Sequence, residues 1–109
     1  MARRYRTEIF EFGEKQIRLR SPLDLRQFHR PDQKGVSDEA FPLFGIVWPS
    51  ARILCELLLE YDVKDKRILE IGCGMALVSI LLKLRGANIT AMDIHPATAE
   101  LLQINVAQN

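Results

Sequence analysis

Two short segments hold the residue types and spacing best suited to chemistry. The first, Glu70-Ile71-Gly72-Cys73-Gly74-Met75-Ala76, joins an acidic side chain to small residues, and Asp93 follows Gly72 by 21 residues. A glycine turn between a strand and a helix lets a ligand approach the backbone and presents the N–H groups of the helix N-terminus. An acidic side chain at the end of the next strand can accept hydrogen bonds from both hydroxyls of an adenosine ribose. The two segments therefore predict a site for an adenosine-containing cofactor.

Two positions distinguish the cofactor classes that use this arrangement. A dinucleotide site needs a small residue at the position of Leu77, where leucine fits poorly. The S-adenosylmethionine pattern, acidic-x-G-x-G-x-G, instead has Ala76 as its third small residue. The Glu70 carboxylate would repel the pyrophosphate of a dinucleotide, whereas it would attract the sulfonium and ammonium groups of S-adenosylmethionine. These residues favour S-adenosylmethionine over NAD.

The surrounding pattern predicts the elements that hold this site. A helix is expected over 49–61, a strand over 67–71, a helix over 75–84, a strand over 88–94 and a last helix from 96. The near-continuous apolar sequence of the first strand is typical of a parallel strand covered on both faces. This order predicts an α/β fold with a Rossmann-like parallel sheet, which binds ligands at the carboxyl ends of its strands. The buried face of the first helix is expected to carry Ile53, Leu54, Leu57, Leu58 and Tyr61.

The N-terminal part of the chain has a different pattern. Residues 4–12 and 15–20 are rich in β-formers around Gly13-Glu14 and predict a β-hairpin. The glycines and prolines of 21–46 predict a loop, with a short helical turn at 22–28. We therefore divide the chain into a hairpin and loop region, 1–44, and a cofactor-binding region, 45–109.

Composition limits the possible functions. The chain has 109 residues, 15 basic and 14 acidic, and its net charge of +1 argues against an obligate binder of nucleic acid or of acidic membranes. Residues 1–35 hold nine basic and five acidic groups, a charge of +4, while the rest holds six and nine, a charge of −3. The basic part is either a solvated hairpin or a docking surface for an acidic substrate or RNA.

Targeting and metal-binding signals are weak. No apolar run is long enough to span a membrane, and the first 20 residues lack the apolar region of a signal peptide. Cys55 and Cys73 form no CxxC pair, and with two distant histidines they predict no metal site. A reducing cytoplasm fits this cysteine usage best.

Three segments resemble one enzyme family. Residues 67–96, RILEIGCGMALVSILLKLRGANITAMDIHP, resemble the cofactor motif of class I S-adenosylmethionine-dependent methyltransferases. The Trp48-Pro49 segment, which begins at Gly45, is similar to one in the nicotinamide N-methyltransferase-like and protein-lysine methyltransferase group. Residues 101–109 resemble the L-x-x-N-x-x-x-N helix of that group, and the hairpin also has a counterpart there.

The resemblance implies roles for particular residues. Gly72 and Gly74, with Cys73 between them, would face the methionine part of S-adenosyl-L-methionine, and Glu70 would bind it directly or through water. The remaining contacts would be made by Asp93 to the ribose, Ile94 to the adenine and Trp48 to the pocket wall. The alternatives are that Asp93 caps the last helix, that Glu70 forms a strand-end salt bridge and that Trp48 is a plain core residue.

Two further side chains near the predicted site carry groups that could react. Cys73 is expected to be a small turn residue, although the nearby helix N-terminus could lower its pKa and make it reactive. His95 is expected to belong to the N-terminal part of a helix rather than to act as a general base. We assign no catalytic residue from the sequence.

The sheet predicted here has fewer strands than the family's domain, so the fold is expected to be incomplete. The sequence therefore indicates the cofactor-binding half of a methyltransferase, with S-adenosyl-L-homocysteine as product and an unidentified acceptor such as a protein lysine or a small amine. The alternative is a truncated, non-catalytic cofactor-binding or interaction module. The unpaired strand edge predicts a homo-oligomer or association with a missing half.

Overall fold

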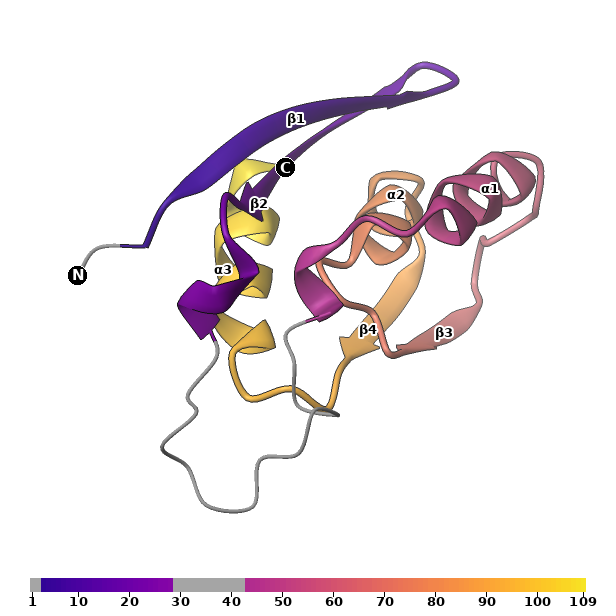
Figure 1. Ribbon diagram of the computed structural model, residues 1–109. Coiled ribbons are helices and arrows are strands. Elements are labelled where there is room, and N and C mark those ends of the chain that lie inside the picture. The colour runs from indigo at the N-terminus through magenta and orange to yellow at the C-terminus, as the bar shows by residue number, and fades with distance from the viewer. Residues whose placement is uncertain (1–2, 29–42) are drawn as a thin grey trace.

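The computed structural model describes residues 3–28 and 43–109, and it confirms the predicted α/β fold with an N-terminal hairpin (Figure 1). Residues 29–42, part of the predicted loop, lie outside the described residues. The elements are β1 (Tyr5–Phe12), β2 (Lys15–Pro22), the 3-10 turns η1 (Leu25–Phe28) and η3 (Leu43–Gly45), α1 (Pro49–Leu58), β3 (Arg67–Ile71), α2 (Leu77–Leu84), β4 (Asn88–Met92) and α3 (Thr98–Gln108).

The hairpin pairs over its full length and buries one face. β1 and β2 are antiparallel, with register from Tyr5↔Pro22 to Phe12↔Lys15, and Gly13 adopts a positive φ of 59° in the turn. The buried face carries two aromatic residues of β1 and two aliphatic residues of β2. These are Phe10, Phe12, Ile17 and Leu19, which join α2 in the main hydrophobic core.

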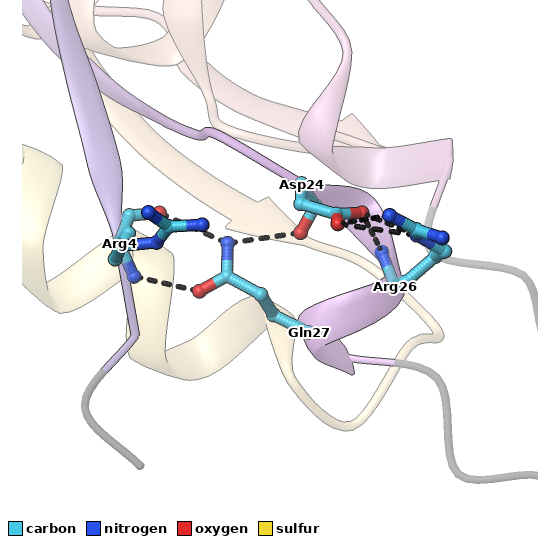
Figure 2. A network of polar contacts seen from close by, with 4 residues as sticks. All are labelled: Arg4, Asp24, Arg26 and Gln27. Atoms are coloured by element: carbon cyan, nitrogen blue, oxygen red, sulfur yellow. Dashed lines mark hydrogen bonds and ion pairs between the residues drawn. The ribbon is translucent and has the colours of Figure 1, made fainter.

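The segment after β2 is tied back to the first strand (Figure 2). The Gln27 side chain accepts from the Arg4 backbone N–H (2.6 Å) and donates to the Arg4 carbonyl (3.0 Å). The same amide donates to the Asp24 carbonyl, and the Asp24 carboxylate accepts from the Arg26 guanidinium at 2.8 Å. The hydrogen bonds of Gln27 therefore hold η1 against Arg4, the residue just before β1.

The parallel sheet consists of β3 and β4, with register from Arg67↔Asn88 to Ile71↔Met92. One face packs on the core through Ile68 and Ile89. The opposite face is open, because Leu69 and Ile71 are 54% and 75% exposed. The expectation that this strand is covered on both faces is thus wrong for the described residues, whose helices α1 and α2 pack together on one face only.

The predicted buried face of α1 is confirmed at Leu58 only, because Ile53, Leu54, Leu57 and Tyr61 are exposed. Cys55 is fully buried, and Ala51 and Leu58 pack partly against the core, whereas Ile53 and Leu57 are 61% and 69% exposed. The small side chains of alanine and cysteine allow close packing between helices, and the larger side chains of Ile53 and Leu57 stay exposed. The helix ends at Leu58 rather than at residue 61.

A second, smaller cluster lies beside the carboxyl ends of β3 and β4. It contains Phe28, Phe44, Met75 and Leu101, and so joins η1, η3, the turn after β3 and α3. Among the residues that the structure describes, no helix is long and apolar enough to span a membrane.

Candidate cofactor site

A cavity of about 660 Å³ lies at the carboxyl ends of β3 and β4. Its volume is in the range of about 300–1,000 Å³ that is usual for small-molecule sites. Three segments wall it: the turn after β3, the segment after β4, and the chain from η3 into α1. The structure brings all the sequence-predicted site residues to this one cavity, namely Trp48, Glu70, Gly72, Cys73, Gly74, Asp93 and Ile94.

The turn after β3 has an unusual backbone. Gly72, Gly74 and Ala76 have positive φ values of 70°, 55° and 65°. Because Ala76 is left-handed, α2 begins at Leu77 and not at residue 75 as the sequence predicts. A Cβ atom on Gly72 would meet no atom within 4 Å, whereas one on Gly74 would lie 3.2 Å from the Phe44 carbonyl oxygen. The turn therefore packs closely on one side and leaves an open, side-chain-free cradle at Gly72.

Asp93 links this turn to the segment after β4. Its Oδ2 accepts from the Gly74 N–H (2.9 Å) and its Oδ1 from the His95 N–H (3.2 Å). The residue before α3 is Ala97, so the alternative that Asp93 caps the last helix is wrong. A carboxylate has about four acceptor positions, and two are left for further donors such as ribose hydroxyls.

Glu70 is held by a residue that the sequence reasoning missed. The Ser79 hydroxyl donates to Glu70 Oε1 at 2.6 Å. Within residues 3–28 and 43–109 the carboxylate therefore has this neutral partner and not the salt bridge considered as an alternative. Burial raises the pKa of Glu70, the hydrogen bonds from Ser79 oppose this, and the Asp93 charge adds a further increase in pKa. Ser79 lies in the first turn of α2, where the helix macrodipole also favours an anion.

We expect Ser79→Ala to make the stability of the chain fall more steeply with rising pH. Because the folded pKa of Glu70 is raised, its contribution is fully present below the unfolded pKa and is lost as pH rises through the folded pKa. Losing the hydroxyl removes a hydrogen bond to the charged form and costs about 1.5–3 kcal/mol where Glu70 is ionised. Urea unfolding across this pH range measures the difference, with Ser79→Thr as the control that keeps the hydroxyl. A penalty of equal size at acid and neutral pH would contradict this assignment.

The other predicted residues differ in exposure. Trp48 is 48% exposed, which rules out the plain core position considered for it, and Ile94 at the cavity mouth is 99% exposed. Burial, followed by the charges of Glu70 and Asp93, raises the pKa of Cys73 to about 11. The suggestion that the helix N-terminus lowers this pKa is thus wrong, and Cys73 is a protonated turn residue at neutral pH.

Phe44 and His95 also line the cavity, and the sequence reasoning did not assign them to the site. Their rings lie 4.6 Å apart, and His95 Nδ1 accepts from the Ala97 N–H at 3.1 Å. This bond lies before α3, which begins at Thr98 with Ala97 as its N-cap. The expectations that the last helix starts at residue 96 and that His95 belongs to its N-terminal part are therefore wrong. The ring contact of Phe44 depends on packing between distant segments, which no local motif indicates.

Comparison with known proteins gives a consistent result. The sequence model of a family described as lysine methyltransferase matches residues 38–109. The chain is 40% identical over 87 residues to the cattle (Bos taurus) protein-lysine methyltransferase METTL21E, covering 75% of this chain and 30% of that protein. It is 44% identical over 67 residues to the zebrafish (Danio rerio) protein N-lysine methyltransferase METTL21A, covering 60% and 30%.

A third relative extends over the hairpin. The chain is 32% identical over 110 aligned positions to the rat (Rattus norvegicus) electron transfer flavoprotein beta subunit lysine methyltransferase, covering 94% of this chain and 42% of that protein. The chain thus spans less than half the length of each of these relatives.

Proposed function

The chain belongs to the lysine methyltransferase family, and on that premise we propose that it binds S-adenosyl-L-methionine as the cofactor-binding part of a protein-lysine methyltransferase. The observation that carries the proposal is the pairing of Asp93 with the Gly72–Gly74 turn across one cavity. This pairing puts a carboxylate with spare acceptor positions beside an open backbone cradle. Both features suit an adenosine ligand that carries no phosphate.

The cavity residues fit this cofactor by their chemistry. Asp93 would accept from the ribose hydroxyls, with the exposed Ile94 against the adenine. Glu70 would favour the cationic methionine part, which the open cradle at Gly72 would receive, and Trp48 would form the outer wall. When bound, S-adenosyl-L-methionine supplies a methyl group on a cationic sulfur, and S-adenosyl-L-homocysteine is the product.

For the acceptor we propose the amine of a protein lysine. The names of the cattle and zebrafish relatives specify protein lysine, and the rat relative is named for a lysine of the electron transfer flavoprotein beta subunit. Methyl transfer depends mainly on in-line placement of the acceptor amine against the sulfonium. Both cysteines are free, which suits the cytoplasmic location that we propose from the sequence.

Calorimetric titration of the chain with S-adenosylhomocysteine, S-adenosylmethionine and NAD tests the proposal. We expect S-adenosylhomocysteine to bind with a dissociation constant in the micromolar range, about −8 kcal/mol, and NAD not to bind measurably. The Glu70 carboxylate and the leucine at position 77 both act against a dinucleotide. Binding of NAD with comparable strength would overturn the cofactor assignment.

The alternative is a non-catalytic module that pairs with a second copy or another protein. It is favoured by the exposed apolar side chains of Leu69 and Ile71 on the open sheet face and of Ile53 and Leu57 on α1. An apolar surface of this kind stabilises association when it is covered. Methylation of an acceptor lysine by the chain would exclude this alternative, whereas association alone is compatible with both functions.

A further inference from the structure

Two asparagines four residues apart, Asn105 on α3 and Asn109 at its C-cap, bind the free edge of β2. Asn105 Oδ1 accepts from the Arg20 N–H (2.7 Å), and its Nδ2 donates to the Arg20 carbonyl (3.2 Å). Asn109 repeats the pattern two strand residues earlier, accepting from the Arg18 N–H (2.9 Å) and donating to the Arg18 carbonyl (2.8 Å). We call this set of four hydrogen bonds the asparagine clamp. Figure 1 shows α3 running beside β2.

The spacing of the clamp follows from the geometry of the two elements. Four residues of a helix rise about 6.0 Å, and two residues of an antiparallel strand about 6.8 Å, so the two amides match alternate strand residues. In an antiparallel pair, alternate residues direct their N–H and C=O groups to the free edge. Asn105 is fully buried with both ends of its amide bonded, so it acts in place of a neighbouring strand.

The N-terminal end of α3 is connected to one wall of the cavity. The segment from Asp93 to Pro96 lines the cavity and runs directly into this helix. Leu101, one turn before Asn105, is fully buried in the cluster that includes Phe44 and Met75. A second contact with the hairpin is made near the start of α3, where the Tyr5 hydroxyl donates to Glu100 at 3.0 Å.

The C-terminal end of β2 packs against the segment that forms the other wall of the cavity. A Cβ atom on Gly45 would collide with Leu25 and lie 3.0 Å from Pro22, so the end of β2 packs directly on this glycine. Gly45 lies three residues before Trp48, and Phe44 contacts both Gly74 and the His95 ring. The clamp thus completes a continuous set of contacts between the two cavity walls. These contacts run from the segment after β4 through α3 and β2 to the chain that leads from η3 into α1.

We propose that Asn105 and Asn109 are positioning residues for cofactor binding, which set the distance between the two cavity walls by fixing α3 to β2. This inference rests on the proposed function, since it concerns the same cavity. It also makes the hairpin, whose two strands precede the family match at residues 38–109, a working part of the cofactor site. Neither asparagine lines the cavity, so their effect passes through the two walls.

The test compares Asn105→Leu with Gln103→Leu, which makes the same kind of change at an exposed position of the same helix. Titration with S-adenosylhomocysteine and the emission spectrum of Trp48, the one tryptophan of the chain, are measured on each. We expect Asn105→Leu to bind at least tenfold more weakly and to shift the Trp48 emission, with its circular dichroism unchanged. Gln103→Leu should behave as the unchanged chain. A folded Asn105→Leu with unchanged affinity and emission would overturn the proposal.

Asn109→Ala serves if Asn105→Leu does not fold, because Asn109 is exposed. It should weaken binding severalfold and increase amide exchange at Arg18, and unchanged binding with increased exchange would overturn the proposal. If the unchanged chain does not bind S-adenosylhomocysteine, the proposed function fails on its own. The clamp is then judged by Trp48 emission alone: a shift in Asn109→Ala but not in Gln103→Leu supports it, and no shift overturns it.

Discussion

Asp93→Ala is expected to lower the affinity of the chain for S-adenosylhomocysteine by at least tenfold. If the carboxylate accepts two ribose hydroxyls, each hydrogen bond to the charged group contributes about 1.5–3 kcal/mol. The sequence alone suggests that this substitution has little effect on folding. The structure changes that expectation, because the Gly74 and His95 N–H groups also lose their acceptor. A loss of stability of about 1–2 kcal/mol should therefore accompany the loss of affinity.

Asp93→Asn separates these two effects. It keeps one oxygen that can accept from a backbone N–H, but it replaces the other oxygen by a donor and removes the charge. We expect it to recover part of the lost stability while its affinity for S-adenosylhomocysteine stays low. Titration calorimetry and urea unfolding on both variants provide the comparison. Normal binding by Asp93→Ala would show that this carboxylate only joins the two loops.

The location of the site could be predicted because it depends on chain order. A glycine turn after one strand and an acidic residue after the next parallel strand must meet at the same sheet edge. That rule brought Gly72, Gly74 and Asp93 together without any knowledge of packing. The Ser79–Glu70 bond could not be found in this way, because it requires the phase of α2, and that phase is set by the left-handed Ala76.

Apart from Leu58, the buried face of α1 was predicted wrongly for a related reason. The spacing of the large apolar side chains indicated that the helix face with Ile53 and Leu57 is buried. The contact with the core is made by Ala51 and Cys55, whose small size lets the helices approach, and by Leu58 of the predicted stripe. Which of two apolar helix faces is buried depends on the shape of the core surface against which the helix packs. That shape cannot be predicted from a single sequence.

Leu81→Ala is expected to cause the largest loss of stability among these substitutions, about 2–5 kcal/mol. Leu81 is fully buried, with an accessible fraction of 0%. It belongs to the core cluster formed by α2 and the hairpin. Truncation removes buried methyl groups and leaves a cavity that close-packed neighbours fill only in part. Against a total stability of about 5–15 kcal/mol, this is a large fraction. Urea unfolding measures it through the midpoint at constant slope.

Leu57→Ala makes the same chemical change on the exposed stripe of α1. Leu57 is 69% exposed, so we expect a change within about 0.5 kcal/mol, with the slightly higher helix propensity of alanine offsetting the lost contacts. The contrast between the two leucines tests the assignment of the buried face directly. If Leu57→Ala destabilised the chain as much as Leu81→Ala, the stripe predicted from the sequence would be buried in solution. In that case a second copy would cover it, and the loss would depend on protein concentration.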